Sequence, residues 1–253
     1  MAAVRLDELT AYCDRLLRLE GCQDWPAAAN GLQVANRGRV RRLAAAVDAT
    51  HTTIQMAVEA GADLLLVHHG LFWNGSFPWT GRRYSLLRLL LDHDLAVYSS
   101  HLPLDAHPRY GNNVQLARAL GFSRTEPFFF SRGVHLGRRI ATRIARDRLV
   151  AKLEAAVGGP VRLLPGGPAT CRRIGIVSGA AGEDLGQAAE EGVDTFITGE
   201  GPHWTHGLAE DLGINVLYAG HYATETFGVK ALAAHLSRKF KLPWVFLDHP
   251  SGL

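Results

Sequence analysis

The sequence lacks any long uncharged apolar run. Its apolar stretches, such as those at residues 64–67 and 86–91, are far shorter than the roughly 18 residues that a bilayer-spanning helix needs. The first 20 residues mix charged and apolar side chains at helical spacing, without the apolar core of a signal peptide. We therefore expect a surface helix there, no membrane partner and a cytoplasmic location.

Cysteine is also scarce, and several common motifs are absent. The three cysteines, Cys13, Cys22 and Cys171, are widely spaced and form no C-x-x-C pair, which argues against a disulfide framework and favours buried thiols in a reducing compartment. No G-x-x-x-x-G-K-[ST], G-x-G-x-x-G, G-x-S-x-G or H-E-x-x-H motif occurs, so a Walker-type nucleotide site is excluded. A net charge of +3 is too small to argue for nucleic acid by itself.

Two His-x-x-x-carboxylate segments stand out against this background. One begins at His101 and ends at Asp105, and the other begins at His221 and ends at Glu225. The first half also contains adjacent histidines, His68 and His69, followed by a glycine. Imidazoles and carboxylates are the ligands that borderline divalent metals prefer. The pattern predicts a metal site, and the number of ligands allows two ions.

These five residues can be divided between two ions. His68 with Asp105 would bind one ion, His69 with His221 the other, and Glu225 would bridge both through its two oxygens. Two or three protein ligands per ion leave positions for water, as in catalytic sites. Neighbouring residues on a strand point to opposite faces, so both histidines can take part only at a turn. In the simpler interpretation they merely cap a strand end.

Further candidates near these ligands have two interpretations each. His101 could act as a general acid or base or support a ligand, or be an ordinary loop histidine. Glu200 could be a base or an orienting carboxylate, or could cap a turn. Trp73, Phe77 and Trp79 could line a pocket that stacks a ring, although core packing is the more common use of such aromatics.

The chain contains a weak internal repeat. Shifting the sequence by 131 positions (172 − 41) aligns residues 41–70 with 172–201, and a shift of 120 (221 − 101) aligns His101 with His221 and Asp105 with Glu225. We interpret this as a duplicated α/β unit, although chance similarity would give the same pattern. The prediction is two similar α/β lobes, 1–124 and 169–253, with a bridging segment of strand and helix at 125–168 and the metal site in the cleft between the lobes. Brändén's rule places ligands beyond the carboxyl ends of parallel strands, where these candidates fall.

Local patterns predict the individual elements. Apolar runs predict strands at 43–47, 63–67 and 95–98. A helix is predicted at 53–60, with Thr52 as its N-cap. Pro103 predicts that residues 101–105 form a loop. Helical spacing predicts a helix at 224–235, with Glu225 in its first turn and His221 just before it, and a basic helical run near 138–156.

At these residues the chain resembles the dinuclear-metal-centre toroid family, the YbgI-like proteins related to NGG-interacting factor three and often labelled type 2 GTP cyclohydrolase I. The matching pieces run in family order: Asn30-Gly31-Leu32-Gln33-Val34, Val47-Asp48-Ala49-Thr50, His68-His69-Gly70-Leu71-Phe72-Trp73, His101-Leu102-Pro103-Leu104-Asp105-Ala106-His107-Pro108, Gly111-Asn112-Asn113, Thr198-Gly199-Glu200 and Gly220-His221-Tyr222-Ala223-Thr224-Glu225. The resemblance implies two similar α/β lobes, a two-metal site between them and a homo-hexameric ring of three dimers. The family's metal ligands fall on His68, His69, Asp105, His221 and Glu225. The segment around 128–144 matches poorly.

Two functional hypotheses follow. The first is a hydrolase with two divalent ions (zinc, iron or manganese) that acts on a nucleotide such as GTP by a cyclohydrolase-type ring opening. The second is a non-catalytic metal-binding ring that scaffolds or binds DNA or a protein partner. The second hypothesis gains support if five arginines line the central hole of the ring, where they could bind DNA or another polyanion. They are Arg138, Arg139, Arg143, Arg146 and Arg148.

Overall fold

The computed structural model describes residues 3–26, 28–73 and 78–252. It is an α/β protein, as predicted, and its chain divides into two compact units. The first unit comprises Met1–Leu104 and Gly228–His249, and the second comprises Asp105–Phe227 and Pro250–Leu253. This division does not coincide with the predicted lobes, because residues 105–124 group with the second unit and 228–249 return to the first.

The first unit is built on a five-stranded sheet of order β13-β4-β5-β6-β2. Strands β13, β4, β5 and β6 are parallel, and β2 is an antiparallel edge strand. A separate pair, β1 with β3, is antiparallel. The strands of this unit are β1 (Val4–Arg5), β2 (Gly31–Val34), β3 (Arg39–Val40), β4 (Leu43–Asp48), β5 (Leu64–His69), β6 (Ala96–Ser99) and β13 (Trp244–Phe246).

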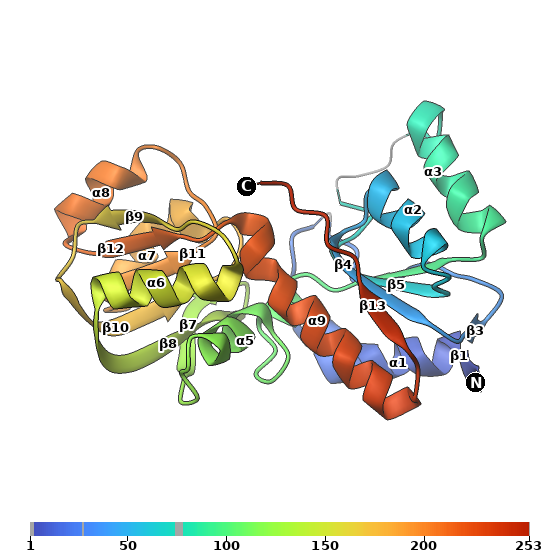
Figure 1. Ribbon diagram of the computed structural model, residues 1–253, viewed down its shortest axis with the longest axis horizontal. Coiled ribbons are helices and arrows are strands. Elements are labelled where there is room, and N and C mark those ends of the chain that lie inside the picture. The colour runs from blue at the N-terminus through green and yellow to red at the C-terminus, as the bar shows by residue number, and fades with distance from the viewer. Residues whose placement is uncertain (1–2, 27, 74–77, 253) are drawn as a thin grey trace. The chain divides into compact units, whose positions relative to one another are not determined.

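Helices cover this sheet by burying apolar faces. In Figure 1, α2 and α3 lie side by side next to β4 and β5, and they share one buried apolar cluster with these strands. On α1, Tyr12 contacts α9, where its hydroxyl lies 2.7 Å from Nε2 of His235. The helices that contribute to this unit are α1 (Leu6–Leu17), the 3-10 turn η1 (Leu19–Gly21), α2 (His51–Glu59), α3 (Gly81–Asp92), α4 (Leu102–Asp105) and α9 (His221–Phe240), the last two of which cross the division between the units.

The second unit is built on a six-stranded sheet of order β7-β8-β10-β11-β12-β9. Its centre, β10-β11-β12, is parallel, and the outer strands pair antiparallel. Side chains alternate across the sheet: Ile197 and Leu217 pack on one face, and Phe196 and Val216 on the other. The strands are β7 (Glu126–Ser131), β8 (Val134–Ala145), β9 (Arg162–Pro165), β10 (Thr170–Ile176), β11 (Thr195–Thr198) and β12 (Asn215–Tyr218).

Helices cover both faces of this second sheet. One apolar cluster joins it to α5 (Asn112–Ala119) and α6 (Arg146–Val157), and another joins it to α7 (Leu185–Glu190) and α8 (Thr205–Leu212). Figure 1 shows α6 in front of the strands and α7 and α8 behind them. A short 3-10 turn, η2 (Ala181–Asp184), precedes α7. Within the described residues, no helix combines the length and apolarity needed to cross a membrane.

The two units share a strand-helix-strand pairing in the same register. Leu43 of β4 pairs with Leu64 of β5, and Ile174 of β10 pairs with Thr195 of β11, each position being offset by 131 (174 − 43 and 195 − 64). In each unit an aspartate accepts hydrogen bonds from two consecutive arginine backbone N–H groups: Asp63 from Arg41 and Arg42, and Asp194 from Arg172 and Arg173. The repeat in the sequence therefore has a counterpart in backbone pairing, as the proposed duplication requires.

The structure corrects some local predictions. Residues 102–105 are helical despite Pro103, because the first turn of a helix does not need the missing N–H group. Helix α9 begins at His221, so that residue lies within the helix and Glu225 one turn later. Residues 138–145 belong to strand β8, and the helix begins only at Arg146. The N-cap of α2 is Thr50, whose side chain accepts from the Thr53 N–H group, instead of Thr52.

Candidate metal centre

In the first unit the candidate side chains gather beyond the carboxyl ends of three parallel strands. Asp48 ends β4, His68 and His69 end β5, and His101 follows β6 by two residues. Parallel pairing brings these strand ends to one edge of the sheet. The histidines of the first unit therefore meet as a consequence of the sheet topology.

His68, His69 and His101 form one cluster. A ligand nitrogen from each ring lies within 4.8 Å of the others, and the His68 ring centroid is 4.8 Å from that of His69 and 4.9 Å from that of His101. His68 and His69 are both strand residues, not turn residues, yet their rings still converge at the strand end. His101, predicted as a catalytic or supporting residue, is thus placed where it can also bind a metal.

Each of the three rings presents Nδ1 to an oxygen that can only accept. Nδ1 of His68 lies 2.9 Å from the backbone carbonyl of Ser100, and Nδ1 of His69 lies 2.8 Å from Oδ1 of Asp48. Nδ1 of His101 lies 2.9 Å from Oδ1 of Asp24. Nδ1 must therefore carry the proton, which in the neutral ring places the lone pair on Nε2. Metal-binding histidines typically have this arrangement.

Asp24 is a site residue that sequence reasoning missed. Its side chain is only 5% exposed, and it accepts hydrogen bonds from the backbone N–H groups of Trp25 and Leu102 and from the Asn30 side chain. Burial alone would raise the pKa of Asp24, but the hydrogen bonds from His101 and Asn30 bring it below its ordinary value. Asp24 lies in a segment without regular structure and belongs to no motif, so the sequence carried no signal for it.

The second unit contributes His221 and Glu225, which lie on one face of α9. Nε2 of His221 is 3.2 Å from Oε2 of Glu225, and its Nδ1 is 2.6 Å from Oε1 of Glu200. Burial would lower the pKa of His221, but the two carboxylates outweigh it and raise this pKa to about 9. Glu200, two residues beyond β11, thus has the same position relative to Nδ1 of His221 that Asp48 has relative to Nδ1 of His69.

Asp105, the last residue of α4, is held in place by two neighbours in the second unit. Its Oδ1 accepts from Asn112 Nδ2 at 2.8 Å and from Ser178 Oγ at 3.2 Å, and the residue is 7% exposed. The backbone of Gly179 lies so close to the Glu225 side chain that a Cβ atom added to this glycine would collide with Oε1 of Glu225. Polar contacts and close packing thus fix the directions of both carboxylates.

The comparison with known proteins decides the family. A model of the Duf34/NIF3 (NGG1p interacting factor 3) family matches residues 4–251 of the chain. The chain belongs to the Duf34/NIF3 family. The resemblance noted in the sequence is thereby confirmed.

Several members of the Duf34/NIF3 family are similar along almost their whole length. The protein named GTP cyclohydrolase 1 type 2 homolog from Deinococcus radiodurans is 40% identical over 251 residues, which cover 98% of this chain and 94% of that protein. The crystal structure of TTHA1606 from Thermus thermophilus has a TM-score of 0.90 at 41% identity and covers 99% of this chain and 100% of that one. The structure of the protein ybgI, described as of unknown function, has a TM-score of 0.91 at 33% identity, with coverage of 99% and 100%.

The donor atoms of this Duf34/NIF3 protein could hold a divalent metal ion. The first unit offers three imidazoles with oriented Nδ1 atoms, and the second offers an imidazole with a carboxylate beside each of its two nitrogens. Mixed nitrogen and oxygen donors suit zinc, iron and manganese. The buried His/Glu groups can therefore hold metal.

Trp73 adds an aromatic wall to the first-unit cluster. Its ring stands edge-on to His101, with centroids 4.6 Å apart, and edge-on to His69 at 5.4 Å. Trp79 instead contacts Phe72 and is 39% exposed. The third aromatic of the predicted group, Phe77, lies outside the described residues.

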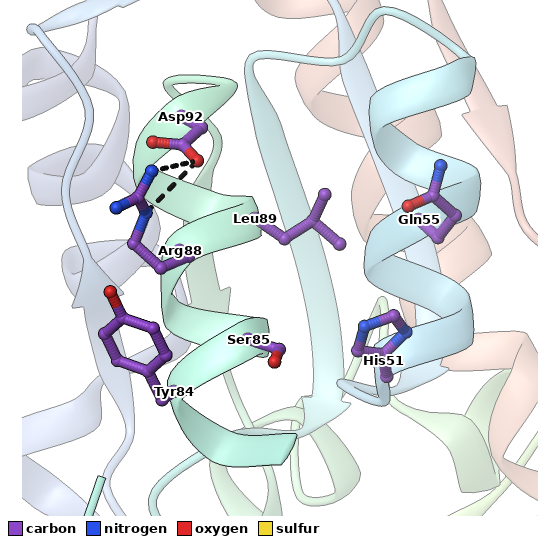
Figure 2. Close-up of a pocket in the computed structure, with 7 residues that line it drawn as sticks. All are labelled: His51, Gln55, Tyr84, Ser85, Arg88, Leu89 and Asp92. Carbon is purple, nitrogen blue, oxygen red and sulfur yellow. Dashed lines mark hydrogen bonds and ion pairs between the residues drawn. The ribbon is translucent and has the colours of Figure 1, made fainter. Parts of the chain in front are cut away.

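A hollow elsewhere in the first unit has a different character. Figure 2 shows it between α2 and α3, where Arg88 forms an ion pair with Asp92 on its own helix. None of the predicted metal ligands lines it. Its lining residues are His51, Gln55, Tyr84, Ser85, Arg88, Leu89 and Asp92.

Proposed function

We propose that this protein is a divalent-metal-dependent hydrolase with a dinuclear centre. The observation that carries the proposal is shared by four histidines: in His68, His69, His101 and His221, Nδ1 is held by an oxygen acceptor. A core histidine needs no such uniform orientation, whereas a metal ligand does. The support therefore comes from the orientation of the rings as well as from the residue types.

In this proposal the two ligand sets together hold two ions. His68, His69, Asp105, His221 and Glu225 are the ligands, with Glu225 shared between the ions. Bound divalent ions supply an activated water at neutral pH. Glu200 holds His221 through Nδ1, and Asp24 holds His101, so that Nε2 of His101 is positioned to give or take a proton during hydrolysis.

We propose a nucleotide such as GTP as the substrate, with hydrolytic ring opening of the base. The support is the name GTP cyclohydrolase 1 type 2 homolog carried by relatives about 40% identical. Trp73, edge-on to His69 and His101, would provide a surface against which a base could pack. The absence of a Walker loop agrees with a site in which metal ions, not a glycine-rich loop, contact the nucleotide.

We also propose the homo-hexameric ring, as a trimer of dimers in the cytoplasm. The support is membership of the Duf34/NIF3 family together with apolar surface: in α3 only Leu90 is buried, whereas Tyr84 is 51% and Leu91 is 55% exposed. Exposed apolar helix faces commonly mark subunit contacts. Light scattering after size-exclusion chromatography tests this, and a monomer at micromolar concentration would contradict it.

The scaffold alternative, a ring that binds DNA or a protein partner, has less support from the residues on which it depends. Arg138 is buried, and Arg139 is bonded to Glu126. Arg146 contacts Asn215, and Arg143 and Arg148 are exposed. These arginines are therefore divided among different environments and do not form one exposed basic face.

The first experiment is elemental analysis of protein purified without chelator, followed by assay with GTP. We expect close to two ions per chain in the wild type and a loss of at least one ion and of hydrolysis in Glu225→Ala. Glu210→Ala, at an exposed position of α8, is the matched control and should change neither. A wild-type chain that stays folded but cannot be loaded with metal would refute the proposal.

His101 needs its own variant because two roles fit its position. His101→Ala should keep both ions and lose turnover if His101 transfers protons. Loss of an ion would instead make it a ligand, in agreement with its place beside His68 and His69. Either result is obtained by measuring metal content and rate on the same sample.

A further inference from the structure

The two residues Ser178 and Gly179 lie just beyond the end of β10, at the carboxyl edge of the second sheet. Ser178 is only 7% exposed, and its Oγ donates to Oδ1 of Asp105 at 3.2 Å. The backbone of Gly179 lies against the carboxylate of Glu225. Two consecutive residues therefore contact two of the carboxylates that are predicted to bind metal.

The backbone of Gly179 also joins this segment to other groups of the metal centre. Its carbonyl accepts from the N–H groups of Gly199 and Glu200, at 2.8 and 3.0 Å. Its N–H group donates to Oγ1 of Thr224 at 3.1 Å, and that hydroxyl donates to the carbonyl of His221 at 2.9 Å. A displacement of the segment would therefore be passed on to all of these groups.

A buried asparagine holds this segment in place. Asn113 is fully buried on α5; its Oδ1 accepts from the Ser178 N–H group at 2.7 Å, and its Nδ2 donates to the carbonyl of Leu136 on β8 at 2.8 Å. The preceding residue, Asn112, donates from Nδ2 to Oδ1 of Asp105 at 2.8 Å. Oδ1 of Asp105 thus accepts from two neutral donors, which orient the carboxylate without neutralising its charge.

We propose that Ser178 is a positioning residue of the metal centre, and that its hydroxyl orients Asp105 so that the second carboxylate oxygen, Oδ2, binds the ion. Carboxylates that bind metals are themselves usually hydrogen-bonded, and the loss of such a partner typically weakens metal affinity about 10- to 100-fold. The proposal rests on the proposed function in one respect, namely that Asp105 is a metal ligand. It adds that the affinity for metal depends on a hydroxyl that need not touch the ion.

The test is calorimetric titration of Zn²⁺ into the full chain after metal has been removed with chelator, together with thermal unfolding of the metal-free protein. We expect Ser178→Ala to weaken the Kd for Zn²⁺ about tenfold or more, because Asp105 loses a bond that orients it. Thr226→Ala is the matched control: it removes another buried hydroxyl of the second unit, which donates to its own helix at Ala223, and it should leave the affinity unchanged. The Tm of metal-free Ser178→Ala should match that of the control, because Asn112 still donates to Oδ1 of Asp105.

Ser178→Thr separates the effect of the hydroxyl from that of packing. It keeps the hydroxyl and should bind Zn²⁺ more tightly than Ser178→Ala, so an equal loss in both variants would overturn the proposal. Wild-type affinity in Ser178→Ala would also overturn it, as would a metal-free Tm far below that of Thr226→Ala, because the hydroxyl would then support the fold as a whole. A wild-type chain that takes up no Zn²⁺ would overturn this proposal together with the proposed function, whereas each of the other outcomes leaves the proposed function standing.

Discussion

Nδ1 of His101 lies 2.9 Å from Oδ1 of Asp24, a carboxylate that also accepts two backbone N–H groups. One buried side chain therefore fixes the start of α4 and the orientation of an imidazole in the metal cluster. Asp24 links the fold of the first unit to the chemistry of its site, although it lies in no helix or strand.

Replacing Asp24 by asparagine should affect both stability and the site. The amide replaces one acceptor oxygen by a donor, and each carboxylate oxygen accepts two of the four hydrogen bonds to this buried side chain. Two hydrogen bonds are therefore lost, at a cost of about 1–3 kcal/mol each. Turnover should fall about 10- to 100-fold with metal content unchanged, because the His101 ring that would transfer the proton loses its orientation. Urea unfolding and initial rates at saturating metal measure the two effects. Asp92→Asn, in an exposed helical ion pair, is the control; equal effects in both variants would contradict a special role for Asp24.

The metal-free chain should lose stability as the pH rises towards 10. His221 has an ordinary pKa of 6.5 that its two carboxylate neighbours raise to about 9. A raised pKa contributes stability that is fully present below about pH 6.5 and is lost as the pH passes 9, amounting to at most about 3 kcal/mol. Unfolding in the presence of chelator between about pH 6 and 10 measures this dependence. His221→Gln should flatten the curve across this range, and an unchanged curve would show that another group is responsible.

Gly179→Ala should disturb the metal centre through the backbone. Gly179 has φ of +72°, which side chains rarely adopt, and an added Cβ would collide with Glu225. We expect a lower Tm and a loss of metal. Gly186→Ala is the control, because that glycine lies in α7 with nothing within 4 Å of the added Cβ. The control should be neutral or slightly stabilising.

Glu200→Gln distinguishes orientation from base catalysis. Oε1 of Glu200 lies 2.6 Å from Nδ1 of His221, so an orienting role predicts metal binding about 10- to 100-fold weaker. Turnover should recover when excess metal restores occupancy. Full metal content with turnover that stays lost would instead assign Glu200 as a base. Metal titration and initial rates at saturating metal separate these outcomes.

The sequence predicted the features that periodicity and motif spacing determine. Buried apolar runs located β4, β5 and β6 to within one or two residues, because buried parallel strands are nearly continuous in apolar residues. From ligand types and the carboxyl-end rule we predicted His68, His69, Asp105, His221 and Glu225 as metal ligands and His101 as a catalytic residue. These roles stay predictions, although the structure contains groups of histidines and Glu225 that could hold a metal ion. The helical conformation of residues 102–105 was not predicted. A proline in the first turn is compatible with a helix, but nothing in the sequence marks the start of this helix.

Contacts that depend on tertiary structure had no sequence signature. Asp24 reaches His101 across 77 positions, and no periodic pattern encodes such a contact.

The repeated strand pairing has a chemical consequence at its carboxyl end. His69 and Glu200 occupy equivalent positions (200 − 69 gives the same offset of 131), yet one offers an imidazole and the other a carboxylate that holds an imidazole. The first unit thus supplies a set of softer nitrogen donors, and the second supplies a set rich in hard oxygen donors. If the proposed dinuclear centre forms, ions bound by such unequal sets would differ in hardness and therefore in which metal each set prefers.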